Sequence, residues 1–311
     1  MTSVINAVLP LFAMVLVGFA AMRFRLMGEA ALSGLNTFVY FFALPAMLFF
    51  TMARAPILEL FDWRLIVAYS GTSVTIFMIA LLGGAVLFRN SFQERAVIAG
   101  ASSFGNIVYL GIPLAIASLG PAAGPPAGMI VVADNLIIIS LTMFCMEAAA
   151  PGTISIPRLF ARVFRGFLRN PFMIAMLVGV VVGILRIPIP EPVDRFGSLL
   201  GGAAGPCALF ALGGSLYGRP IAEGKGEVGF AVVLKLALMP VLAWMASALL
   251  LDLPGETVAL IVLIAGLPTG ANIFVLATQY GVASARASTI VLVTTGISVL
   301  SVSGILIYMG Q

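Results

Sequence analysis

Two interrupted apolar stretches decide how this chain folds. The first reads SSFGNIVYLGIP at residues 102–113, and the second reads GLPTGAN at residues 266–272. Each lies inside a longer apolar run. Proline removes a backbone donor and clashes with the preceding turn, while glycine adds backbone freedom. Both stretches therefore predict a helix that is broken in its interior.

The composition places these helices in a lipid bilayer. Of the 311 residues, 61% are hydrophobic and only 9% are charged, with a mean hydropathy of +1.16. A soluble chain usually has about a quarter of its residues charged, so this one has too few charges to cover a water-facing surface. An ordinary cytosolic enzyme, a disordered chain and a secreted disulfide scaffold are all disfavoured.

The apolar runs predict about ten transmembrane helices. A helix needs roughly 20 apolar residues to cross about 30 Å of hydrocarbon. The alternating pattern of a membrane barrel is missing, so we expect an all-α integral membrane protein. The predicted spans cover residues 3–22, 32–53, 64–88, 96–118, 126–148, 171–186, 196–216, 228–250, 257–280 and 287–308.

The basic residues predict the orientation. Even-numbered loops carry Arg54, Arg64, Arg186 and Arg195, and Lys235 lies inside a span. Because basic loops stay in the cytoplasm, we expect a multi-pass protein of the cell membrane with both termini outside the cytoplasm. The odd-numbered loops carry the other eleven of the sixteen basic residues: Arg23, Arg25, Arg89, Arg95, Arg158, Arg162, Arg165, Arg169, Arg219, Lys225 and Arg286.

The two halves of the chain match at a constant offset of 161 residues. Five spans in each half is an odd number, so the second copy enters the membrane from the opposite side. Such inverted-topology repeats are typical of secondary transporters. We expect one five-helix repeat over 1–150, an amphipathic basic cytoplasmic linker over 151–170 and the inverted repeat over 171–311. The matched pairs are Pro10 with Pro171, Gly18 with Gly179, Arg25 with Arg186, Pro45 with Pro206, Gly105 with Gly266, and Gly120 with Gly281.

The breaks are the predicted substrate site, at about mid-membrane depth. Exposed amides at the start of a half-helix favour an anion, and freed carbonyls favour a cation. Pro113 and Pro268 suit the first turn of the half-helix after each break. Two simple kinks without function are the alternative. The candidate substrate-binding residues are Asn106, Tyr109, Gly111, Pro113, Gly266, Pro268, Thr269, Gly270 and Asn272.

Two charged residues fall deep inside predicted spans. Asp134, followed by Asn135, lies in the fifth span, and Lys235 lies in the eighth. A charge at that depth costs about 3 kcal/mol or more and marks a functional site by default. We assign Asp134, Asn135 and Lys235 to ion coupling, because an Asp–Lys pair that breaks on protonation would link proton movement to transport. A snorkelling Lys235 or a purely structural pair are the alternatives.

The sequence resembles the auxin efflux carrier family, which includes plant auxin carriers and bacterial permeases for malonate, malate and similar acids. The resemblance rests on Gly105-Asn106, on Leu110 to Leu114, on Leu267-Pro268 running to Gly281, and on Lys235 followed by Pro240. It implies ten spans with broken, crossing fourth and ninth helices. It also implies that Asn106 and Asn272 lie near the crossing, where substrate binds.

The function expected from these features is secondary active transport of a small organic anion, a mono- or dicarboxylate, by alternating access. The alternative is a cation/proton antiporter that uses Asp134 as its ion site. An enzyme is not expected, since neither a membrane-depth HExxH motif nor a nucleotide-binding loop is present. Apart from a coupling proton or sodium ion, we expect no cofactor, metal site or nucleic-acid partner. The lipid bilayer surrounds the chain, and a homodimer is left open.

Overall fold

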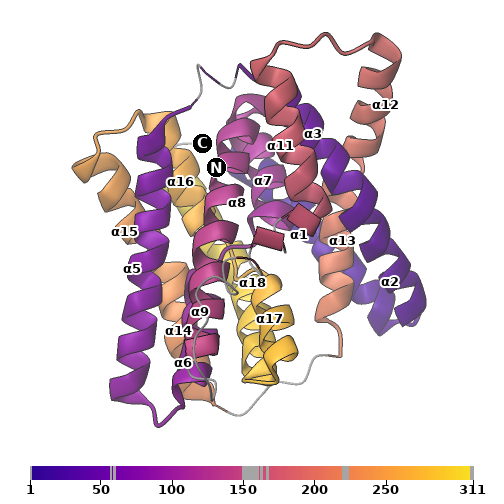
Figure 1. The fold of residues 1–311 in the computed structure, drawn as a ribbon. Helices are drawn as coiled ribbons and strands as arrows, with labels where there is room; N and C mark the ends of the chain where they lie inside the picture. The colour runs from indigo at the N-terminus through magenta and orange to yellow at the C-terminus, as the bar shows by residue number, and fades with distance from the viewer. Residues whose placement is uncertain are drawn as a thin grey trace.

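Helices make up the regular structure of the chain (Figure 1). The structure is a computed structural model that describes residues 2–56, 58, 61–148, 161, 164–165, 168–218 and 224–308. Within these residues, six helices are long and apolar enough to cross a membrane, and four shorter apolar helices accompany them. The prediction of an all-α fold is confirmed. Most of the predicted linker, 151–170, lies outside the described residues.

The first half of the chain contains the first interrupted helix. Asp62 caps α5 by accepting a hydrogen bond from the Arg64 amide, and Ser91 and Glu94 form a capping box at the start of α6. The elements are α1 (Thr2–Arg23), α2 (Glu29–Phe38), η1 (Val39–Ala43), α3 (Leu44–Ala53), α5 (Trp63–Leu87), α6 (Phe92–Ser103), η2 (Ile107–Gly111), α7 (Ile112–Leu119), η3 (Pro121–Ala123), α8 (Gly124–Asp134), η4 (Asn135–Ile139) and α9 (Ser140–Ala148).

The second half contains the second interrupted helix. Its elements are α11 (Pro171–Ile184), α12 (Glu191–Gly202), α13 (Ala204–Leu216), α14 (Lys225–Val233), η5 (Leu234–Leu238), α15 (Met239–Trp244), η6 (Met245–Leu250), α16 (Gly255–Ala265), α17 (Asn272–Tyr280) and α18 (Ser284–Tyr308).

Large apolar side chains cover much of the outer surface. Val86 is 85% exposed, Leu250 80% and Leu300 76%. So many exposed large apolar side chains are unusual on a soluble monomer. It suits contact with lipid, as the composition predicts.

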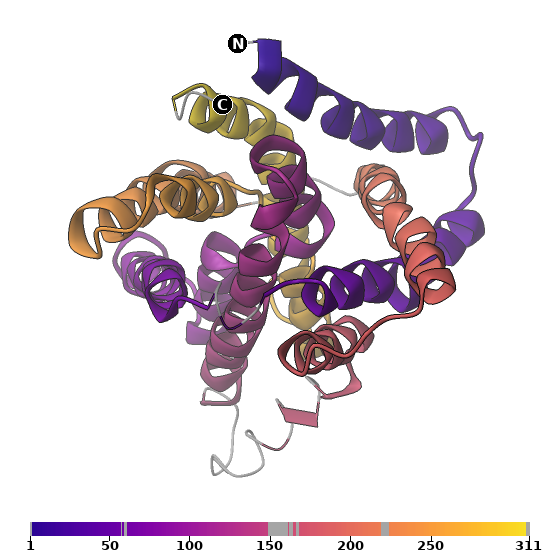
Figure 2. The ribbon, with the colours of Figure 1, turned by 90° about the horizontal axis from the view of Figure 1, so that it is seen from above.

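The helices fall into two packed groups (Figure 2). In one group α3 packs against α11 and α12, and α1 packs against α13. In the other, α5 packs against α6, α8 and α15, while α17 packs against α18. The two interrupted helices belong to the second group, and α7 and η2 meet α1 and α13 of the first. The first group therefore forms one wall beside the interrupted helices.

Two glycines of the first group make equivalent close contacts, each with a backbone carbonyl of the other half of the chain. A Cβ on Gly18 would lie 2.0 Å from the carbonyl oxygen of Phe210, and a Cβ on Gly179 would lie 2.5 Å from that of Phe49. Small residues let membrane helices approach this closely. At the offset of 161 residues, Gly18 corresponds to Gly179 and Phe49 corresponds to Phe210. The contact between α1 and α13 is thus repeated between α11 and α3 with the halves exchanged.

The turns after α1 and α11 also have the same backbone. Arg25 and Arg186 have φ angles of 57° and 50°. The Leu26 amide bonds to Ala21 O at 2.9 Å, and the Ile187 amide bonds to Val182 O at 3.1 Å. These helix ends close through a left-handed residue, and each of the three residues named in one turn corresponds to one in the other at the offset of 161.

Candidate substrate and ion site

The two interrupted helices pair with each other at their breaks. Helix α6 ends at Ser103 and helical structure resumes at Ile107, whereas α16 ends at Ala265 and α17 begins at Asn272. Both predicted interruptions are confirmed. Gly105 and Thr269 form an antiparallel backbone bridge between them.

Two backbone hydrogen bonds make this bridge. The Asn106 amide donates to Pro268 O at 2.8 Å, and the Gly270 amide donates to Phe104 O at 3.1 Å. Buried backbone groups need partners, and each break supplies them for the other. A Cβ on Gly270 would lie 2.6 Å from the Phe104 ring and 2.9 Å from Gly105 O. The close approach therefore requires glycine at position 270.

The two prolines occupy different positions relative to their helices. Pro113 lies in the first turn of α7, but the π-helical turn η2 precedes it, so the helix after the first break already begins at Ile107. Pro268 lies inside the second break, before α17 begins. The expectation that Pro268 starts the half-helix is wrong, because Pro268 precedes α17 and its carbonyl accepts the hydrogen bond from the Asn106 amide in the bridge.

Thr269 fastens the bridge to two further helices. Its hydroxyl donates to Ala101 O in α6 at 2.6 Å, and its amide donates to Thr294 Oγ1 in α18 at 3.1 Å. The sequence reasoning missed Thr294. Its position carried a signal, because the next residue, Thr295, corresponds to Asp134 of the first half at the offset of 161 residues.

Lys235 binds the end of α16. Its side chain is completely buried, and Nζ lies 3.0 Å from Ala265 O and 3.1 Å from Met239 Sδ. The C-terminal end of a helix has partial negative charge, which a cation stabilises. The π-helical turn η5 carries this lysine.

Asp134 approaches the other break. It is completely buried, and its Oδ2 accepts a long hydrogen bond of 3.4 Å from the Gly105 amide. Its Oδ1 has no hydrogen-bond partner in the described part of the chain. The expected direct pair with Lys235 is therefore not formed, because each side chain binds backbone at its own break. The Lys235 Nζ nevertheless lies 3.7 Å from where a Gly105 Cβ would be.

Two hydroxyl groups of α5 belong to the same buried region. Tyr69 and Ser73 are both completely buried, and within the described residues neither hydroxyl has a hydrogen-bond partner. Tyr69 Oη lies 3.2 Å from the position of a Gly105 Cβ. The sequence reasoning missed both residues, although two polar residues four apart in an apolar span share one helix face.

The remaining predicted site residues differ in their burial and in the groups that they contact. Asn106 is buried, as are Gly111 and Gly266, while Tyr109 is partly buried. The Asn135 amide group turns back to Val131 O at 2.9 Å on its own helix. Asn272 begins α17 and is exposed. The structure thus gathers Asn106, Pro268, Thr269, Gly270, Asp134 and Lys235 around the bridge, and not the side chains of Asn135 and Asn272.

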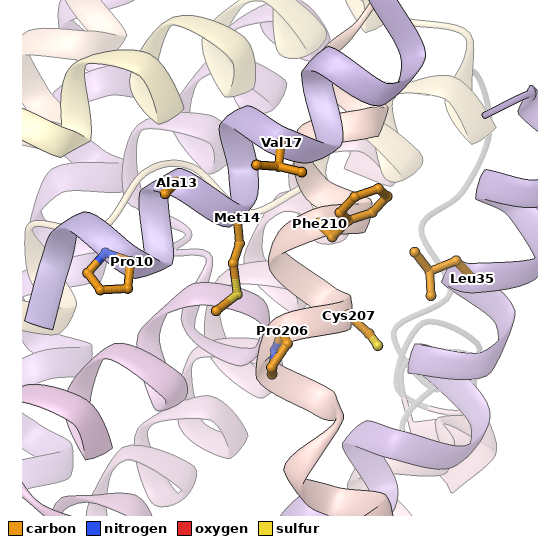
Figure 3. A pocket seen from close by; sticks show the side chains of 8 residues that line it. All are labelled: Pro10, Ala13, Met14, Val17, Leu35, Pro206, Cys207 and Phe210. Carbon is orange, nitrogen blue, oxygen red and sulfur yellow. The ribbon is translucent and has the colours of Figure 1, made fainter. Parts of the chain in front are cut away.

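A cavity of about 400 Å³ between α1, α2 and α13 lies in the other helix group (Figure 3). Its lining is apolar, and it includes Pro10, Met14, Leu35, Pro206 and Phe210. Without a charged group or hydroxyl, this cavity offers nothing to bind a carboxylate. It is not a candidate for the substrate site.

The chain is similar to known membrane transporters over nearly its whole length. Residues 3–306 match the family described as membrane transport protein. A protein of Rhizobium meliloti (strain 1021) named "Putative malonate transporter" is 36% identical over 307 residues, which are 98% of this chain and 96% of that protein. The "Uncharacterized transporter YfdV" of Escherichia coli (strain K12) is 26% identical over 91% of this chain and 90% of its own length.

A plant relative matches part of the chain. Auxin efflux carrier component 3 of Arabidopsis thaliana is 31% identical over 152 residues, which are 47% of this chain and 23% of the carrier. Together with the helices long enough to cross a membrane, these matches establish the class of protein. The chain belongs to the membrane transport protein family, the family of the auxin efflux carriers, and is a multi-pass transporter of the lipid bilayer.

Proposed function

We propose that this transporter is a secondary carrier that moves a small organic anion, a mono- or dicarboxylate, across the cell membrane by alternating access. The observation that carries the proposal is the backbone bridge between Gly105 and Thr269, with Lys235 and Asp134 buried beside it. The name of the Rhizobium relative supports a dicarboxylate such as malonate.

The break after α6 offers groups that suit an anion. The first amides of a helix have no partner within the helix, and the helix after the break begins at Ile107. Asn106 immediately precedes these amides, and the ammonium of Lys235 lies close to Gly105. A carboxylate held here would accept hydrogen bonds from amides and a side-chain amide near a cation.

The membrane topology in this proposal is ten spans in two inverted repeats of five, with both termini outside the cytoplasm. The reciprocal contacts of Gly18 and Gly179 support the repeat, as do the matching turns at Arg25 and Arg186. The bias of basic residues toward odd-numbered loops supports the orientation.

Alternating access in this proposal is a movement between the two helix groups. The group of α1, α2, α3, α11, α12 and α13 is the scaffold, and the group that carries the breaks is the mobile core. The bridge and the bonds of Thr269 and Lys235 join α6, α16 and α18 within the core, which supports its movement as one unit.

Substitution of Asn106 tests the substrate site. Loss of one hydrogen bond to a charged group costs about 1.5–3 kcal/mol, so Asn106→Ala should weaken malonate or malate binding roughly ten- to a hundred-fold. Thermal-shift titration of purified protein measures this. Asn36→Ala, the same change in α2, is the matched control. Unchanged affinity in a well-folded Asn106→Ala protein would place the substrate elsewhere.

A cation/proton antiporter remains the second candidate, because one observation favours it. Tyr69 Oη, Ser73 Oγ and Asp134 Oδ1 are three buried oxygens without a hydrogen-bond partner in the described residues. One carboxylate and two hydroxyls suit a proton or a sodium ion. In the leading proposal the same oxygens hold the coupling ion.

Asp134→Asn separates the two candidates. In the antiporter the change abolishes all exchange, and no carboxylate binds to the unchanged protein. In the carrier it removes only the dependence of transport on pH or sodium, and malonate binding is retained. Uptake into proteoliposomes at varied pH and sodium, together with malonate titration of both proteins, distinguishes these outcomes.

A further inference from the structure

A cavity of about 310 Å³ lies between the scaffold and the helix that follows the first break. Pro113 and Ile116 of α7 line one side of it, while Thr51 and Arg54 at the end of α3 and Ser198 of α12 line the other. Most of the lining is apolar, and Thr51, Arg54 and Ser198 provide its polar side chains beside the helix that follows the first break.

Arg54 is held across this cavity by α12. Its Nε donates to Asp194 Oδ1 at 2.8 Å, and its Nη2 donates to the Asp194 carbonyl at 3.2 Å and to Ser198 Oγ at 2.7 Å. The guanidinium also lies over the Phe50 ring, 5.1 Å from its centre. The arginine is therefore placed by several contacts before any ligand arrives.

The Arg54 guanidinium retains capacity for an anion. Arginine has five N–H donors, and the bonds made within the described residues use Nε and Nη2, which leaves Nη1. The Arg54 and Asp194 side chains are 44% and 42% exposed, so solutes can reach both groups. Thr51 and Ser198 add hydroxyl groups to the same lining. A guanidinium beside hydroxyl donors matches a carboxylate.

We propose that Arg54 and Ser198 form an outer docking site for the carboxylate of the substrate, where the substrate displaces Asp194 before it moves on to the break. This inference rests on the proposed function. The charge pattern places the α3–α5 connection outside the cytoplasm, so the site receives substrate from that side.

The docking site and the break act one after the other. Pro113 lies seven residues after Asn106, which is on the order of 10 Å along a helix. A small dicarboxylate is too short to span that distance. Arg54 therefore governs how readily substrate enters, whereas Asn106 and Lys235 hold it at the centre.

Opposite effects of two substitutions test the docking site. Arg54→Gln removes the cation, so the KM for malonate or malate uptake into proteoliposomes should rise about ten-fold or more, with little change in the maximal rate. Asp194→Asn removes the carboxylate that competes with the substrate for Arg54, so the KM for malonate or malate uptake should fall. If the Arg54–Asp194 pair only braces the scaffold, both variants raise the KM or lose activity alike, and the proposal is overturned.

Arg64→Gln is the matched control for the arginine. Arg64 pairs with Asp62 at 2.8 Å on the same side of the membrane, and the hydrogen bond from its side chain holds the pKa of Asp62 below its ordinary value. It does not line the cavity. Its loss should leave the KM unchanged, and a rise equal to that of Arg54→Gln would indicate a general effect of surface charge, against the proposal.

Filling the cavity gives a test that does not depend on Arg54. A Cβ on Gly202, which lines the cavity, would meet no atom within 4 Å. Gly202→Leu should therefore fold, occupy the cavity and raise the KM. Gly34→Leu makes the same change in α2, where a Cβ also meets no atom within 4 Å, and should not. Unchanged uptake by Gly202→Leu would overturn the docking site.

The failure of this inference differs from failure of the proposed function. If unmodified protein takes up malonate or malate and Asn106→Ala weakens binding, but Arg54→Gln and Gly202→Leu change nothing, only the docking site is wrong. If unmodified protein takes up neither acid, the proposed function fails, and the docking site fails with it.

Discussion

The ammonium nitrogen of Lys235 lies 3.0 Å from the carbonyl oxygen of Ala265, the last residue of α16. The contact joins a fully buried cation to the end of a helix that stops inside the protein. It replaces part of the hydration that the ammonium would have in water, since a buried charge without partners is strongly unfavourable.

Lys235 and Asp134 should depend on each other although they do not form a direct pair. Removing either charge leaves the opposite charge buried and less compensated. We expect Lys235→Met and Asp134→Asn each to lower the thermal stability of the purified protein, and the double variant to lose less than both single losses together. A coupling energy of about 0.5–3 kcal/mol is expected. Strictly additive losses would mean that the two charges do not interact.

The bridge predicts a specific requirement for glycine at position 270. In Gly270→Ala the new methyl group would lie 2.6 Å from the Phe104 ring and 2.9 Å from the Gly105 carbonyl. Overpacking of this kind costs about 1–3 kcal/mol, so the melting temperature and transport should both fall. Gly296→Ala in α18, where a Cβ meets no atom within 4 Å, serves as the control and should leave both unchanged.

The reciprocal glycine contacts predict matched defects in the scaffold. Gly18→Ala and Gly179→Ala would each bring a Cβ against a backbone carbonyl, at 2.0 and 2.5 Å. Both should lower the thermal stability by similar amounts, while Gly34→Ala on α2 should not. If one of the two variants were as stable as the unmodified protein, the two contacts would not be equivalent.

The orientation predicts which cysteines can be labelled from outside the cell. After Cys145 and Cys207 are replaced, Arg186→Cys should react with an impermeant thiol reagent in intact cells. Ser91→Cys, in the connection between α5 and α6, should react only after the membrane is permeabilised. Labelling of Ser91→Cys in intact cells would contradict the proposed topology.

The breaks could be predicted because their cause is local. Proline and glycine act on the backbone within a turn or two, so SSFGNIVYLGIP and GLPTGAN reveal interruptions without knowledge of the fold. The same holds for several helix limits. The expected span 64–88 corresponds to Trp63–Leu87, and the span 171–186 to Pro171–Ile184.

The pairing within the site could not be predicted because its causes lie far apart in the chain. Nothing near Pro268 indicates that its carbonyl serves Asn106, or that Lys235 turns to Ala265 instead of Asp134. In the sequence, Arg54 stood out only as a basic residue in an even-numbered loop, where the charge pattern has few. Such a departure from the pattern is itself a signal of a functional residue. The division of the chain into two repeats at residues 150 and 171 stays a prediction. So do the coupling ion and the homodimer.

The bridge between the two halves has a consequence for how the protein is made. Translation produces the Phe104 carbonyl and the Asn106 amide long before Gly270 and Pro268, their partners, leave the ribosome. Unpaired backbone groups in lipid cost several kcal/mol each. The first half therefore stays incompletely folded until the second half has been synthesised. We expect residues 1–150 made alone to be degraded, and to be rescued when residues 171–311 are made as a separate chain in the same cell.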